Sequence, residues 1–149
     1  MFQALDSRLR GNDRREKGEN LLKCVSPIIK KMKIQSYKEL VVWQKAVELS
    51  VQIYALTEQY PREEIYGITS QMRRAAVSIA SNIAEGRYRG TRKDFCQFLR
   101  VAFGSGAELE TQIEISKRLL KTKALDYRSV DALLAEVMRM LNVMIEKLQ

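Results

Sequence analysis

Basic side chains concentrate in one stretch of the sequence, between positions 73 and 100. The seven cations of this stretch are Arg73, Arg74, Arg87, Arg89, Arg92, Lys93 and Arg100. The same stretch holds two acidic residues, Glu85 and Asp94, and Tyr88 lies among the cations. Arginine and lysine neutralise phosphates, and an aromatic ring offers a nucleobase a surface for stacking. The pattern therefore predicts a site for RNA or DNA, with a solvated turn between two helices as the alternative.

A second group of cations lies at the expected end of a helix. Its members are Lys117, Arg118, Lys121 and Lys123. Positive charge is stabilised at a helix C-terminus by the helix dipole. We therefore interpret this group as helix-terminal charge rather than as a second binding site.

Groups for catalysis or metal binding are scarce in this sequence. It contains no histidine, which excludes Glu-x-x-His metal pairs and His-activated serine or cysteine nucleophiles. The carboxylates of Glu108, Glu110 and Glu114 do not converge on one helical face. Cys24 and Cys96 do not have the spacing of metal ligands. We expect no enzyme activity, no metal and no cofactor.

The composition is typical of one globular domain. The chain has 149 residues, of which 46% are hydrophobic and 30% charged, enough for a single core. No apolar run approaches the roughly 18 residues that span a bilayer, and arginines interrupt the N-terminus too early for a signal peptide. Two cysteines form no disulfide framework, which favours the cytoplasm.

Most of the net charge of +8 comes from the N-terminus. Residues 1–34 contain nine Lys or Arg against four Asp or Glu, a net +5, and the remaining residues contain 17 against 14, a net +3. Because residues 1–34 lack apolar periodicity, we predict a disordered basic tail there and a folded domain over residues 35–149. The tail is either a basic arm for nucleic acid or an appendage upstream of a natural start at Met32, and we favour the appendage.

A predicted helix over residues 69–86 organises the other elements. Apolar side chains recur along it and just before it at spacings of three and four, at Ile65, Ile68, Met72, Ala75, Ile79 and Ile83. The opposite face carries a polar seam of Gln71, Arg74, Ser78, Asn82 and Glu85, which could belong to subunit contacts. Gly86 is expected to end this helix in a left-handed conformation.

The next predicted helix, over residues 91–120, has the most regular repeat. Its apolar register is Phe95, Leu99, Ala102, Gly106, Leu109, Ile113, Ser116 and Leu120. Thr91 is expected to cap it. The glycines Gly104 and Gly106 lie within this register without a preceding strand, which argues against a phosphate-binding loop. We predict a continuous or slightly bent helix with a close crossing there, with a break in the helix as the alternative. A last helix is predicted to begin around residues 126–129, with a single apolar repeat of Val130, Leu134, Val137, Leu141, Met144 and Leu148.

The first helix is predicted to begin near Ser36, whose spacing to Glu39 is that of a capping box. One apolar face holds Leu40, Val47, Val51 and Tyr54, and a second holds Val42, Ala46, Leu49 and Ile53. The remaining polar strip is narrow, so the helix carries more apolar surface than the core of a small monomer needs. We therefore expect the second face to make contacts between subunits. Four amphipathic helices with short connections predict an all-α, antiparallel up-down-up-down four-helix bundle.

Three segments also carry a family resemblance: YKELVVWQKAVELSVQIY, QMRRAAVSIASNIAEG and FCQFLRVAFGSGAELE. Together they resemble the bacterial four-helix-bundle family encoded in 23S rRNA intervening sequences, over residues 35–149. Members of that family are similar to the accessory protein of diversity-generating retroelements. The resemblance implies a ring-like homopentamer with a role in nucleic-acid or nucleoprotein binding, and it implies no catalytic residue.

Two classes of function remain open at this point. The first is a nucleic-acid-binding oligomer that contacts RNA or DNA through the cations of residues 73–100. The second is an oligomeric scaffold that docks a protein partner, such as a polymerase, without touching nucleic acid. Salt-dependent binding to RNA or DNA distinguishes the two.

Overall fold

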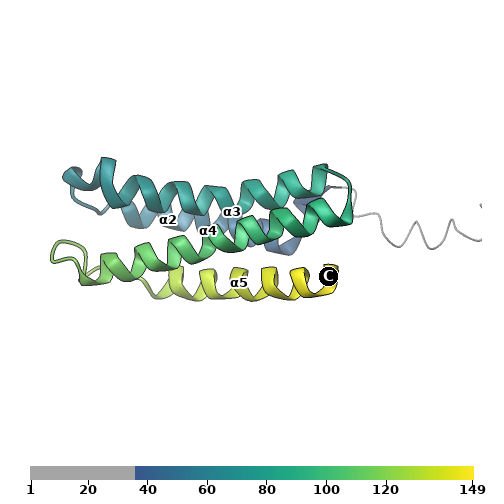
Figure 1. The fold of residues 1–149 in the computed structure, drawn as a ribbon. Helices are drawn as coiled ribbons and strands as arrows, with labels where there is room; N and C mark the ends of the chain where they lie inside the picture. The colour runs from purple at the N-terminus through teal and green to yellow at the C-terminus, as the bar shows by residue number, and fades with distance from the viewer. Residues whose placement is uncertain (1–35) are drawn as a thin grey trace, which may run out of the picture. The chain divides into compact units, whose positions relative to one another are not determined.

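Four long helices make up residues 36–149, the part of the chain that this computed structural model describes (Figure 1). They are α2 (Val41–Thr57), α3 (Ser70–Tyr88), α4 (Arg92–Arg118) and α5 (Arg128–Leu148). Short 3-10 helices, η1 (Tyr37–Glu39) and η2 (Arg62–Glu64), and one π-helical turn, η3 (Ile65–Thr69), complete the described elements, which include no strand. The all-α prediction is confirmed, whereas the predicted disordered tail lies outside the described residues.

The helices α2 and α5 run antiparallel. Ser129, at the start of α5, donates a hydrogen bond of 2.6 Å to Gln52 near the end of α2. Further along the same pair of helices, Lys45 forms an ion pair of 3.0 Å with Glu136. In Figure 1 the α3–α4 connection lies at one end of the bundle, and the α2–α3 and α4–α5 connections lie at the other. This arrangement is compatible with the predicted up-down-up-down order.

The core consists mainly of the apolar faces that the periodicity predicts for α3, α4 and α5. Its largest fully buried side chains include Leu49, Ile53, Met72, Ile79, Ile83, Leu99, Leu109, Ile113, Val137 and Leu141. The predicted stripe of α3 is wrong at its start, because Ile65 is 47% exposed. Non-helical backbone at Gly67 separates Ile65 from the regular helix, so its side chain leaves the stripe. The predicted register of α4 is wrong at its end, because the helix stops at Arg118 and Leu120 is 83% exposed.

The apolar faces of α2 are assigned differently from the prediction. The face with Leu49 and Ile53 is the core face, so it is not available for subunit contacts. The excess apolar surface lies on the other face, where Val51 is 64% and Tyr54 is 43% exposed. The helix also begins later than predicted, at Val41, because the cap of Ser36 serves η1 instead.

Two glycines bring helices close together. The prediction that Gly86 ends α3 is wrong: the helix continues to Tyr88, and the positive φ of 81° belongs to Gly90. Gly86 is buried, and a Cβ atom there would lie 2.5 Å from the Cβ of Phe98 in α4. At Gly106 a Cβ atom would overlap the sulfur of a methionine in α5. The predicted continuous α4 with a close crossing is thus confirmed.

A buried polar network closes the end of the bundle at which α5 begins. The Tyr60 hydroxyl lies 3.0 Å from that of Tyr127, which donates to the Thr122 carbonyl at 3.0 Å. Thr122 in turn donates to the Ser116 carbonyl at 2.6 Å. Burial raises the pKa of the Tyr60 hydroxyl well above its ordinary value. The network satisfies polar groups that would be costly to bury without partners.

Candidate nucleic-acid interface

The structure does not gather the seven predicted cations at one site. Arg73 joins α3 to α2: its Nε donates to Thr57 Oγ1 at 2.8 Å, and its guanidinium lies 4.6 Å from the centre of the Tyr54 ring. Arg74 is exposed one residue further along α3. Both lie about 20 Å along the helix from Tyr88, at a rise of roughly 1.5 Å per residue. Arg73 and Arg74 therefore do not belong to the same site as the cations that follow Tyr88.

The cations at the end of α3 are partly engaged within the chain. Arg89 forms an ion pair of 2.6 Å with Glu85, and its guanidinium lies 4.7 Å from the centre of the Phe98 ring. The hydrogen bond to Glu85 raises the pKa of Arg89, so this side chain stays charged. Arg87 is half-buried. These two residues add positive potential near the α3–α4 connection, but Arg89 already has an acidic partner.

Arg92 has a structural role that its position in the sequence does not indicate. Its Nε and Nη2 atoms donate to the backbone carbonyls of Leu148 and Lys147 at 3.2 and 2.9 Å. Those carbonyls lie at the end of α5, where no intrahelical donor remains for them. Thr91, the predicted cap of α4, accepts a hydrogen bond of 3.0 Å from the Asp94 amide. Arg92 thus joins the first turn of α4 to the last turn of α5.

Lys93 and Arg100 lie in one hollow beside that junction. The hollow has a volume of about 630 Å³ and is lined by Arg92, Lys93, Cys96, Gln97, Arg100, Leu148 and Gln149; we call it the basic groove. Lys93 and Arg100 are seven residues apart in α4, so they share a face and lie about 10 Å apart along the axis. Both are exposed, and neither forms an ion pair with another residue of the described range. The basic groove is the one place within residues 36–149 where the structure leaves predicted cations together and open to a ligand.

An aromatic cluster lies at the same end of the bundle. The Tyr37 ring contacts the Trp43 ring edge-on at 5.0 Å and the Tyr88 ring at 5.4 Å between centroids. Trp43 is half-buried, whereas Tyr88 is 79% exposed. The sequence marks Tyr88 as a candidate stacking surface but not the two rings behind it. Those rings come from the start of the domain, and only the packing of η1 and α2 against α3 brings them to Tyr88.

Two of the four cations in the second group, Lys117 and Lys121, are paired with acidic residues. Lys117 pairs with Glu114 at 2.6 Å and with Asp131 of α5 at 2.9 Å. The hydrogen bond from Lys117 lowers the pKa of the Glu114 carboxyl, which stays ionised. Lys121 lies 3.5 Å from Glu63. These contacts agree with helix-terminal charge rather than with a second binding site.

The polar seam predicted on α3 faces another helix of the same chain at its centre. The hydroxyl of Ser78 lies 2.9 Å from that of Ser105 in α4, and Asn82 donates to the Ser78 carbonyl at 2.8 Å. These side chains are half-buried or buried. Ser78 and Asn82 therefore contribute to packing within the chain.

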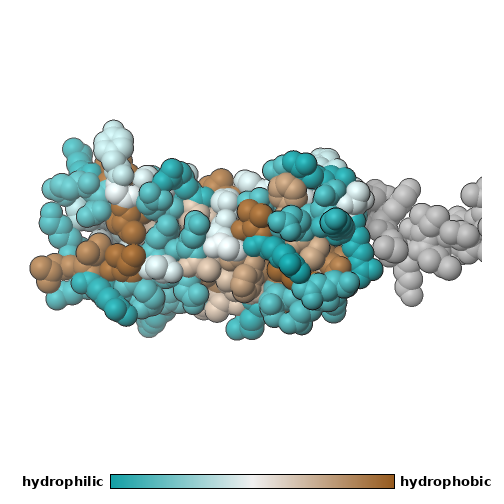
Figure 2. Space-filling model, viewed as in Figure 1, coloured by the Kyte–Doolittle hydropathy of each residue, from teal (hydrophilic) through white to brown (hydrophobic). Residues whose placement is uncertain are grey.

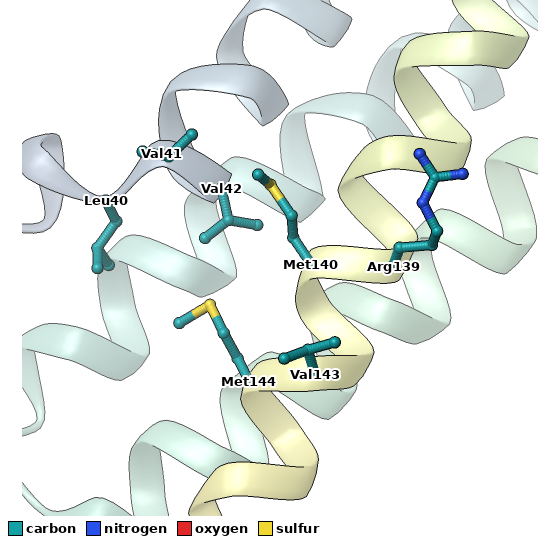
Figure 3. A pocket seen from close by; sticks show the side chains of 7 residues that line it. All are labelled: Leu40, Val41, Val42, Arg139, Met140, Val143 and Met144. Atoms are coloured by element: carbon teal, nitrogen blue, oxygen red, sulfur yellow. The ribbon is translucent and has the colours of Figure 1, made fainter.

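Two apolar hollows flank α2. The first, of about 380 Å³, lies between α2 and α5 and is lined by Leu40, Val41, Val42, Arg139, Met140, Val143 and Met144 (Figure 3). The second, of about 320 Å³, lies between α2 and α3 and is lined by Val47, Ser50, Val51, Tyr54, Val77, Ala80 and Ser81. On the face shown in Figure 2, hydrophilic residues predominate and hydrophobic residues form separate patches. The hollows identify α2 as a helix with apolar surface left to cover.

Within residues 36–149, no group of three or more Cys, Asp or Glu side chains is placed to hold a metal ion. In the same range, every helix is too short or too polar to cross a bilayer.

Comparison with known proteins supports the resemblance seen in the sequence. Residues 38–143 match the family described as 23S rRNA-intervening sequence protein. A crystal structure from Bacteroides thetaiotaomicron VPI-5482, described as a protein with unknown function from the S23 ribosomal protein family, is 28% identical with a TM-score of 0.63. That similarity covers 70% of this chain and 98% of the other. No curated protein matches the chain. Since the family match spans most of the bundle, the chain belongs to the 23S rRNA-intervening sequence protein family.

Proposed function

We propose that this protein is a non-enzymatic, cytoplasmic, homo-oligomeric protein that binds RNA or DNA through the basic groove. One observation carries the proposal: Lys93 and Arg100 lie exposed in the same hollow, beside Arg92 and without an acidic partner in residues 36–149. Lys93 lies in the first turn of α4, where the positive end of the helix dipole adds to its potential. The names of the family and of its crystallised relative refer to ribosomal RNA and to a ribosomal protein family, in line with a nucleic-acid ligand.

An oligomer would strengthen this binding without new contacts. Two phosphate contacts on one protomer, to Lys93 and Arg100, give a log–log salt slope of roughly −1.4 on single strands or about −1.8 on duplex DNA. A pentamer, the state that the family resemblance implies, would present the basic groove five times and raise avidity. Phosphate contacts hold no base information, so we expect little sequence preference from the basic groove alone.

The test is the salt dependence of binding in two charge-matched variants of the full chain. The double substitution Lys93→Gln and Arg100→Gln should make the slope shallower by about 1.4 on single strands, because two contacts are lost. The matched control is Lys121→Gln with Lys123→Gln, which removes the same charge beyond the opposite end of α4 and should leave the slope unchanged. Both variants keep the tail, so any contribution from it cancels. Equal slopes in the two variants would locate the binding site outside the basic groove.

The second candidate function is an oligomeric scaffold for a protein partner. The apolar hollows on both sides of α2 favour it, because they offer apolar surface that a phosphate-binding site does not use. Absence of salt-sensitive binding by the wild-type chain to single-stranded and duplex RNA or DNA would make the scaffold the leading function.

A further inference from the structure

Tyr88 stands out among the exposed aromatic residues because other rings hold it in place. It is 79% exposed at the last turn of α3 and packs against Tyr37, which packs in turn against the half-buried Trp43. A contact between aromatic rings stabilises one orientation of each. The contact with Tyr37 leaves most of Tyr88 accessible. The aromatic cluster thus presents a positioned ring to the solvent.

Tyr66 provides a comparison within the same chain. It is 95% exposed in η3, at the end of the bundle opposite to Tyr88, and has no ring contact with another residue of the described bundle. The basic groove does not extend to it, since that groove is lined by α4 residues near Arg92 and by the end of α5. Both tyrosines are therefore exposed, but only Tyr88 has a ring contact in the described bundle and lies near the basic groove.

The positioned ring and the basic groove lie close enough for one ligand to reach both. Lys93 follows Tyr88 by five positions in the sequence, so their Cα atoms are at most about 18 Å apart. Arg100 lies about 10 Å further along α4. A stretch of a few nucleotides covers such distances, and proteins that bind single strands combine a positively charged groove with aromatic rings in this way.

We propose that this end of the bundle binds single-stranded nucleic acid, with a base stacked on Tyr88 and phosphates a few nucleotides away on Lys93 and Arg100. This inference rests on the proposed function and adds to it the form of the nucleic acid and the group that contacts the base. A base in a duplex is already paired and stacked, and it must leave the helix before its face can meet a protein ring. The aromatic cluster consequently favours single strands over duplexes, while the basic groove alone contacts the phosphates of either.

The test compares two fluorescent probes of equal length and charge: a single-stranded oligothymidylate, and an abasic oligomer with the same sugar–phosphate chain. The full-length wild type should bind the thymidylate more tightly. Substitution Tyr88→Leu should weaken thymidylate binding by about 5- to 150-fold for each base that loses its stacking, and leave the abasic probe unaffected. Tyr88→Phe keeps the ring and should behave as the wild type. The control Tyr66→Leu removes another exposed tyrosine and should change neither affinity.

Each outcome separates stacking from phosphate binding. Equal affinity of the wild type for the two probes, or unchanged thymidylate binding by Tyr88→Leu, would overturn stacking and leave the proposed phosphate contacts intact. Loss of binding to both probes in Tyr88→Leu, with its helix content unchanged, would also overturn stacking as the role of this ring. If the wild type binds neither probe at any salt concentration, this inference fails, and the proposed function fails with it only if duplex DNA and RNA are not bound either.

Discussion

Replacing Gly86 by alanine should weaken the bundle relative to the same replacement at Gly104. Both glycines lie inside helices, where alanine is more favourable than glycine by about 1 kcal/mol. At Gly104 a Cβ atom meets nothing within 4 Å, so Gly104→Ala should raise the free energy of unfolding by that amount. At Gly86 the Cβ atom would lie 2.5 Å from the Phe98 Cβ atom, which is fixed to the α4 backbone and cannot rotate away.

The difference between the two variants isolates the cost of this overlap. The gain in helix propensity is common to both variants and cancels, which leaves an overpacking cost of about 1 to 3 kcal/mol for Gly86→Ala. For a chain of this length, the difference corresponds to about 2 to 12 °C in melting temperature.

Urea unfolding followed by circular dichroism measures the difference, with both variants at one protein concentration because oligomer stability depends on it. Equal unfolding midpoints for Gly86→Ala and Gly104→Ala would refute the close crossing of α3 and α4. That crossing sets the spacing between the two helices from which Tyr88 and Lys93 project. A disrupted crossing is therefore also expected to weaken thymidylate binding, whereas Gly104→Ala is not.

Three further predictions concern assembly, the tail and alkaline pH. Light scattering during size exclusion should give the wild type a mass near five times 17.2 kDa. Val51→Glu, on the exposed face of α2, should lower this mass without loss of helix content. A monomeric wild type at micromolar concentration would refute the pentamer. A chain that starts at Met32 should melt within a few degrees of the full chain, and a larger drop would show that the tail packs on the bundle. Because the folded state keeps the Tyr60 proton that the unfolded state loses above about pH 10, stability should be full below that pH and fall as the pH rises above it. Tyr60→Phe should show a shallower decline in urea titrations, and an unchanged decline would exclude Tyr60 as its source.

The sequence was sufficient for α4 and α5 because each has a single apolar stripe. Leu99, Leu109 and Ile113 repeat at helical spacing, and one register accounts for all of them. For α2 it was not sufficient, since two apolar faces compete there. The helical periodicity of the sequence fits both faces of α2 equally well, and only the packing of α2 against the other helices determines which face is buried in the core. Gly86 was misassigned for a related reason: glycine serves both helix ends and close crossings, and the choice depends on Phe98 in another helix.

Predicting the candidate site had the same limit. The spacing of the cations identified the end of the bundle at which the basic groove lies, but it treated Arg89, Arg92 and Lys93 as equivalent. The structure distinguishes them by their partners. Arg92 reaches the carbonyls of Lys147 and Leu148 at the end of α5, a helix far from it in the sequence. Arg89 meets an acidic residue one helical turn away. Such contacts depend on local and tertiary packing, so charge spacing alone could not separate structural from available cations.

The two ends of the bundle differ in how their polar groups are used, and this difference favours one end for a ligand. At the end where α5 begins, Lys117 is paired with two carboxylates and the Tyr60 hydroxyl is bound within a buried network. A cation that already has an acidic partner gains less from a phosphate, because the partner must be separated or repelled when the phosphate arrives. At the opposite end, Lys93 and Arg100 have no such partner in the described bundle, and Tyr88 keeps most of its ring exposed. A ligand that carries both negative charge and flat apolar faces therefore gains most at that end, and single-stranded nucleic acid carries both.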